Sequence, residues 1–228
     1  MTESKNFMRK RLTGYWIKNA EIQFLTIMGV FLFYFLWQYV VIGGTTLENV
    51  LMSVPYLTKM LGAFMIVIYQ ASSNKNTFSM ALAFGSTRRE AFTGHQIALG
   101  IEAAQILFVN VLLDIVVLRV EGTALTWNVC GYKVLFNLAI LFLAMGLGQI
   151  GATVVARLGN KAMVIISIFF GIVFAIGIGG GLLLAENGAI ILANWNQIVW
   201  VSFVAGFVIY ITGILTERRY LLKMEVTI

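Results

Sequence analysis

With 228 residues, of which 60% are hydrophobic and only 11% charged, and a mean hydropathy of +0.89, the chain is too apolar for a soluble domain. Its formal net charge of +6 would suggest a nucleic-acid partner in a soluble protein. Here we expect no nucleic acid, because membrane orientation and the anionic lipids of the cytoplasmic leaflet account for the basic residues.

Six long apolar stretches are each predicted to be a membrane-spanning helix. Each has about the 17 to 25 residues that a helix needs to cross the hydrocarbon core. Because lipid offers the backbone no hydrogen-bond partner, such segments must be helical. The spans are predicted near 24–42, 51–69, 98–120, 134–156, 162–185 and 198–215. The expected fold is therefore all-α, with one transmembrane domain over residues 1–228.

Lysine and arginine are concentrated on one side of these spans. Thirteen of the sixteen lie in the N-terminal segment, in the connections between spans two and three and between spans four and five, and in the C-terminal tail. Only Lys59, Arg119 and Lys133 lie on or near the other side. The positive-inside rule then predicts that both termini are cytoplasmic.

The segment 7–21, ahead of the first span, mixes basic with apolar and aromatic residues at helical spacing. We expect an amphipathic helix that lies in the membrane interface. Arg9 and Arg11 would face lipid phosphate. Tyr15 and Trp16 would sit in the headgroup layer. The alternative is an ordinary basic flank with an aromatic anchor.

The connection between spans two and three is the most structured part expected outside the membrane. Residues 77–84 are an apolar run too short to cross a bilayer, and Gly85 ends it. Thr87 and Glu90 then form a T-x-x-E capping box, which marks a helix start. A helix over 88–120 would be about 50 Å long, which exceeds the hydrocarbon thickness. Its first two turns would project into the cytoplasm, where we expect a partner to dock.

Three ionisable residues fall inside predicted spans, where charge is costly: Lys59, Glu102 and Asp114. Lys59 and Asp114 are expected at a similar depth near the outer leaflet, so an ion pair between spans two and three is predicted, with a transport role as the alternative. Glu102 is expected either to extend to water at the cytoplasmic edge or to line a vestibule.

Small residues recur in spans four and five, as in the pair Ala144 and Gly148. Small-xxx-small spacing allows helix backbones to approach closely. We expect these residues to serve packing within one bundle.

No catalytic or metal-binding constellation is found in the sequence. His95 is the only histidine and has no second histidine or cysteine partner for a metal, so we expect a buried or interfacial hydrogen bond. Cys130, the only cysteine, is expected in an outer loop. Neither a Walker motif nor H-E-x-x-H occurs. The chain is therefore predicted to be no enzyme, with no catalytic residue, metal or cofactor of its own.

This arrangement resembles the permease subunit of type-2 ABC exporters, the small six-helix kind of Gram-positive bacteria. The resemblance covers nearly the whole chain as architecture. A basic helix precedes span one, a helical element around 83–94 (AFGSTRREAFTG) joins spans two and three, and a semi-apolar outer segment precedes span six. The stretch FGSTRREAF is similar to what these permeases have at that place.

The resemblance implies a dimer with a second permease copy or paralogue in the bacterial cell membrane. It also implies cytoplasmic ABC ATPase subunits, which would bind ATP and Mg²⁺, in addition to contacts with membrane lipids. A coupling helix over 78–92 would insert into the ATPase. Its contact residues would be Phe78, Leu82, Phe84, Arg88, Arg89 and Glu90. The few intramembrane charges favour an apolar or amphipathic cargo, such as a hydrophobic peptide, lipid or drug.

Two other classes remain open. One is a membrane-embedded substrate-binding subunit, such as the capturing component of a vitamin importer. The outer residues Trp127, Asn128, Trp195 and Asn196 offer little for a small polar ligand, which disfavours it. The other is an immunity or scaffold protein that binds peptides without transporting them.

Overall fold

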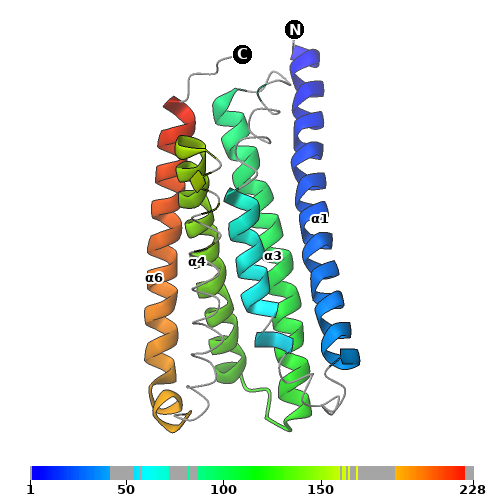
Figure 1. Cartoon of the computed structure of the whole chain (residues 1–228), viewed down its shortest axis with the longest axis vertical. Helices are drawn as coiled ribbons and strands as arrows, with labels where there is room; N and C mark the ends of the chain where they lie inside the picture. Colours follow the sequence, from blue (N-terminus) through cyan, green and yellow to red (C-terminus); the bar gives the residue numbers. More distant parts are fainter. Residues whose placement is uncertain are drawn as a thin grey trace.

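The computed structural model is a bundle of long helices (Figure 1). It describes residues 2–41, 54–56, 58–71, 82, 87–159, 161, 162, 164, 168 and 188–223. Side chains are described for these residues except 2–13, 34, 35, 37–39, 41, 128 and 188–195.

The described elements are all helices, which confirms the all-α prediction for this part of the chain. They are α1 (Thr2–Val41), the helix Val54–Ala71, α3 (Arg88–Val120), α4 (Trp127–Leu158) and α6 (Gly188–Lys223). In Figure 1, α1 and α3 begin at the end of the bundle at which α4 and α6 end. The chain therefore enters and leaves the described bundle at the same end.

Four of the described helices are long and apolar enough to cross a membrane. They are Val54–Ala71, Arg88–Val120, Val129–Leu158 and Asn196–Lys223. They correspond to the predicted spans two, three, four and six, and are compatible with a multi-pass membrane protein. The predicted first span, 24–42, lies within α1 except for its last residue, which is outside the described part. The fifth, 162–185, falls almost entirely outside the described residues. The end of α4 and the start of α6 lie at opposite ends of the bundle (Figure 1).

Residues 7–21 are helical as predicted, but they do not form a helix of their own ahead of the first span. Residues 2–41 form one helix of 40 residues, about 60 Å long at the rise of an α-helix. Helical hydrogen bonds are local, and polar or basic side chains do not interrupt them. The segment therefore prolongs the first predicted span. The outer loop predicted at Cys130 is also wrong, because this residue lies in the first turns of α4.

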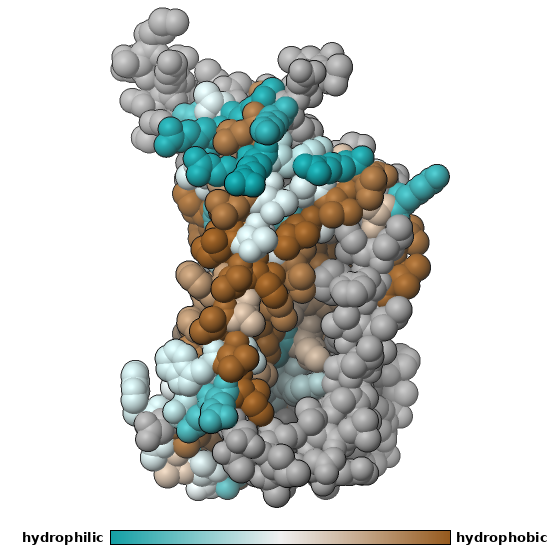
Figure 2. Space-filling model, turned by 90° about the vertical axis from the view of Figure 1, so that its left-hand side faces the viewer, coloured by the Kyte–Doolittle hydropathy of each residue, from teal (hydrophilic) through white to brown (hydrophobic). Residues whose placement is uncertain are grey.

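Basic side chains gather where α3 begins and α4 and α6 end, and we call this the basic end. Its described members are Lys18, Arg88, Arg89, Arg157, Lys161, Arg218, Arg219 and Lys223. Figure 2 shows hydrophilic side chains towards both ends of one face and a hydrophobic band between them. Such a band is the surface that helices present to the hydrocarbon of a bilayer.

α4 and α6 pack closely and in parallel. A Cβ atom on Gly146 would lie 2.6 Å from the carbonyl carbon of Ile209, and one on Gly206 would lie 2.6 Å from the carbonyl oxygen of Ala139. Because only glycine fits at such distances, the two backbones can touch. The prediction that small residues serve helix packing is confirmed for α4.

Two apolar clusters hold the other helices together. The larger combines α1, the helix Val54–Ala71, α3 and α4, through Ile27, Ile66, Val67, Leu99, Ala103, Ile106, Leu141, Ala144 and Met145. The second lies at the basic end and consists of Trp16, Ala20, Ala91, Ala98 and Leu221. This basic-end cluster fixes the first turns of α3 against α1 and the end of α6.

Candidate functional site

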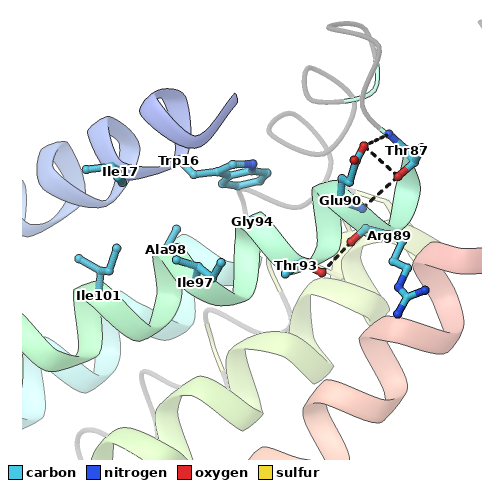
Figure 3. Close-up of a pocket in the computed structure, with 10 residues that line it drawn as sticks. All are labelled: Trp16, Ile17, Thr87, Arg89, Glu90, Thr93, Gly94, Ile97, Ala98 and Ile101. Atoms are coloured by element: carbon cyan, nitrogen blue, oxygen red, sulfur yellow. Dashed lines mark hydrogen bonds between the residues drawn. The ribbon is translucent and has the colours of Figure 1, made fainter. Parts of the chain in front are cut away.

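The start of α3 is defined by a complete capping box. Thr87 has extended backbone angles (φ −72°, ψ 154°), and its hydroxyl accepts the N–H of Glu90 at 3.2 Å. In return, Oε2 of Glu90 accepts the N–H of Thr87 at 3.1 Å (Figure 3). Each side chain satisfies a backbone donor that the helix start leaves free. The predicted capping box and the predicted helix over 88–120 are both confirmed.

The same end of α3 is tied to the ends of the neighbouring helices. Nη1 of Arg88 donates to the carbonyl oxygen of Leu222 in α6 at 3.1 Å. The guanidinium of Arg157, in the last turn of α4, lies 5.4 Å from the ring centre of Tyr220. Arg89 is exposed. The basic end is therefore a connected surface, with the exposed Arg89 at the start of α3.

Trp16, predicted as an interfacial anchor, is buried between two helices and is not displayed to lipid. Its side chain is 2% exposed and reaches from α1 to α3, where a Cβ on Gly94 would lie 2.4 Å from its Nε1. Its ring centre is 5.6 Å from that of His95. The ring fits there because Gly94 has no side chain, so Trp16 joins two helices. Tyr15, the other predicted anchor, is partly buried.

A pocket of about 500 Å³ opens between α1 and α3 at the basic end. Its lining consists of Trp16, Ile17, Thr87, Arg89, Glu90, Thr93, Gly94, Ile97, Ala98 and Ile101. Figure 3 shows the polar residues at the start of α3 and the apolar residues further along the helix, facing Ile17 of α1. The pocket therefore has a polar end and an apolar end.

Behind this pocket, a buried polar network connects four helices. Nε2 of His95 lies 2.8 Å from Oε1 of Gln70 and 3.3 Å from Oε1 of Glu217. Nε2 of Gln96 donates to Oε2 of Glu217 at 2.9 Å, and Nε2 of Gln149 donates to Oε1 of Gln96 at 3.0 Å. The hydrogen bond predicted for His95 is confirmed. Because polar groups are costly in apolar surroundings unless bonded, these contacts hold the helices in one arrangement.

Sequence reasoning missed the partners of His95. Glu217 lies just beyond the predicted end of span six, yet it is fully buried. The glutamines are uncharged and far apart in the sequence. The available signal was amide side chains within apolar segments, which membrane helices use for bonds between helices.

The predicted ion pair between Lys59 and Asp114 is confirmed, with Nζ 2.8 Å from Oδ1. Nδ2 of Asn137 in α4 donates to Oδ2 of Asp114 at 2.9 Å. Lys133 is a more distant cation, with its Nζ 4.0 Å from Oδ1. The pair is thus part of a cluster that joins three helices at the end opposite the basic end.

Glu102 fits neither expectation. It is 1% exposed, so it neither extends to water nor lines an open vestibule. Within the part of the chain that the structure describes, its Oε1 has no hydrogen-bond partner. It lies on the face of α3 that packs into the core, one turn before Ile106.

The other residues predicted to meet a partner have mixed outcomes. Phe78 and Phe84 lie outside the described residues, so their roles stay predictions. Leu82 is half-buried and packs against the basic-end cluster. Arg9 and Arg11 lie within α1, and their side chains also fall outside the described part. Of the predicted coupling helix over 78–92, residues 88–92 form the first turns of α3.

Comparison of the chain with protein-family models, curated proteins and solved structures finds no match.

Proposed function

We propose that the chain is the transmembrane subunit of an ATP-driven ABC exporter in a bacterial cell membrane, with six spans and both termini in the cytoplasm. Cytoplasmic ATPase subunits bind ATP and Mg²⁺ and contact the basic end. A second permease, identical or paralogous, completes the membrane domain. The cargo is apolar or amphipathic: a hydrophobic peptide, a lipid or a drug.

The best support is the way in which the first turns of α3 contact the other helices. Trp16 of α1 packs on Gly94, and Arg88 donates to the end of α6 at 3.1 Å. Gln96 bonds to Glu217 of α6 at 2.9 Å and to Gln149 of α4 at 3.0 Å. A partner that moves this helix start therefore acts on several helices at once. Nucleotide binding to the ATPase can shift the membrane domain only through contacts that differ between its two states. In this proposal, the contacts of the first turns of α3 are the ones that differ.

The charge distribution supports the orientation. Thirteen of the sixteen lysines and arginines are predicted on one side of the spans, and in bacterial membranes that side is the cytoplasm. An ATPase in the cytoplasm would then meet the capped start of α3.

The intramembrane charges support an apolar or amphipathic cargo. The carboxylate of Asp114 forms an ion pair with Lys59 at 2.8 Å and accepts a hydrogen bond from Asn137 at 2.9 Å. Glu102 is buried in the core. None of these three predicted charges is therefore displayed to a strongly polar substrate.

Affinity purification of the tagged full chain in mild detergent tests the proposal. We expect an ABC ATPase and a second permease copy to co-purify. A monomer that retains a small polar ligand would instead favour the substrate-binding class. A chain recovered with peptide but without an ATPase would favour the immunity or scaffold class.

A further inference from the structure

We propose that the pocket between α1 and α3 binds one anionic phospholipid from the leaflet at the basic end. An oxygen of the headgroup or glycerol ester accepts the indole N–H of Trp16. One acyl chain lies against Ile17, Ile97 and Ile101. This site does not depend on the transport proposal.

The indole of Trp16 is the first reason. The side chain is 2% exposed, and among the described residues its Nε1 has no hydrogen-bond partner. A buried indole N–H usually finds an acceptor, so its absence points to one supplied from outside the chain. The ring lines the pocket, between its polar and apolar ends (Figure 3). Nε1 itself is covered in this structure, so the indole must turn towards the pocket for an oxygen there to accept its N–H.

The other polar side chains at the pocket are largely engaged with each other. Thr87 and Glu90 are joined by the capping box, and the Thr93 hydroxyl donates to the carbonyl oxygen of Arg89 at 2.9 Å. What remains at the polar end is the donor of Trp16 and the cationic side chain of Arg89. The indole N–H suits an acceptor oxygen. Arg89, whose guanidinium points away from the indole in Figure 3, favours an acceptor that belongs to an anionic headgroup such as a phosphodiester.

The apolar end indicates a lipid and not a soluble anion. Ile17 is 38% exposed and Ile97 is 54% exposed, so this end opens on the side of the bundle that faces the bilayer. At about 500 Å³, the pocket falls within the ~300–1,000 Å³ typical of small-molecule sites. The surrounding basic end attracts anionic lipids over zwitterionic ones.

Native mass spectrometry of the full chain tests the proposal, using phosphatidylglycerol and phosphatidylcholine with identical acyl chains. Trp16→Phe keeps the aromatic ring and removes the N–H. Trp200→Phe is the matched control, because Trp200 is 54% exposed on α6. We expect the loss of one hydrogen bond to weaken phosphatidylglycerol retention by about three- to tenfold in Trp16→Phe only. Wild type should retain phosphatidylglycerol in preference to phosphatidylcholine.

A second measurement covers the case in which Trp16→Phe folds poorly. Phosphatidylglycerol with a photoactivatable acyl chain should label α1 at Ile17 and α3 between Ile97 and Ile101. Ile97→Trp fills the apolar end from an exposed position and should abolish that label. Labelling confined to other faces overturns the proposal, as does equal retention by Trp16→Phe and Trp200→Phe. Equal binding of the two lipids overturns its anionic specificity.

Discussion

Lys59 on the helix Val54–Ala71 and Asp114 on α3 form an ion pair with 2.8 Å between Nζ and Oδ1. The second carboxylate oxygen accepts a hydrogen bond from Asn137 of α4 at 2.9 Å. Three helices thus meet at one carboxylate that is 3% exposed. Within apolar surroundings such a pair stabilises the bundle only as a unit, because either charge alone is costly.

Removing one partner of this pair should therefore destabilise the protein more than removing both. We expect Lys59→Met to lower stability by about 3–5 kcal/mol, the usual cost of leaving a buried charge unpaired. Lys59→Met with Asp114→Asn should recover part of the loss. Lys133→Met is the control, since its Nζ is 4.0 Å from the carboxylate and its side chain is 31% exposed. Thermal unfolding in detergent measures all four proteins, and a double variant that is merely additive would contradict the paired role.

Gly94 should be intolerant of any side chain, because Trp16 occupies the space of its Cβ at 2.4 Å. We expect Gly94→Ala to destabilise by about 1–3 kcal/mol through overpacking. Gly100 on the same helix has no atom of the described residues within 4 Å of a Cβ position. Gly100→Ala should therefore be neutral or stabilising by up to ~1 kcal/mol through helix propensity. The melting temperatures of Gly94→Ala and Gly100→Ala, each compared with wild type, test this prediction. Equal shifts would show that Trp16 does not pack on Gly94.

Local sequence signals predicted much of the fold. Hydropathy located four helices that are long enough to span, and the spacing of Thr87 and Glu90 located the start of α3 to the residue. The match in depth between Lys59 and Asp114 predicted their pairing. Each of these signals depends either on neighbouring residues of one helix or on the depth that two residues share in the membrane.

The predictions that failed depended on contacts between distant segments. Trp16 has the sequence context of an interfacial anchor, and only the space left by Gly94 on another helix explains its burial. Glu217 follows an apolar span and was the subject of no prediction, yet it is fully buried and lies against Gln96 and His95. Hydropathy along one segment cannot show which segment will cover it.

The buried network predicts a specific sensitivity at Glu217. Replacing it with leucine leaves the side-chain nitrogen of Gln96, bonded at 2.9 Å, without its acceptor. An unsatisfied buried donor costs about 1–3 kcal/mol, so Glu217→Leu should melt at a clearly lower temperature. Glu217→Gln keeps an acceptor oxygen and should lose less. Thr216→Leu, at the neighbouring position, which is only partly buried, should be close to wild type. A Glu217→Leu protein as stable as Thr216→Leu would refute the network's structural role.

The proposed orientation predicts which end of the bundle is reached from outside the cell. In a Cys130→Ser background, Thr123→Cys lies in the exposed turn between α3 and α4, and Arg219→Cys lies at the basic end. A membrane-impermeant thiol reagent should label Thr123→Cys in intact cells, and Arg219→Cys only after the membrane is opened. The reverse pattern would place the basic end outside and exclude a cytoplasmic ATPase there.

The measurement that tests the central claim most directly compares the two ends of α3. Arg89 is exposed in the first turn, and Arg119 is exposed in the last. Arg89→Glu and Arg119→Glu therefore make the same charge change on one helix, away from the core. We expect the ATPase to co-purify with wild type and Arg119→Glu, with cargo-stimulated ATP hydrolysis. Arg89→Glu should be inserted and folded normally but lose the ATPase or its stimulation. Normal ATPase binding and stimulated hydrolysis in Arg89→Glu would contradict the account.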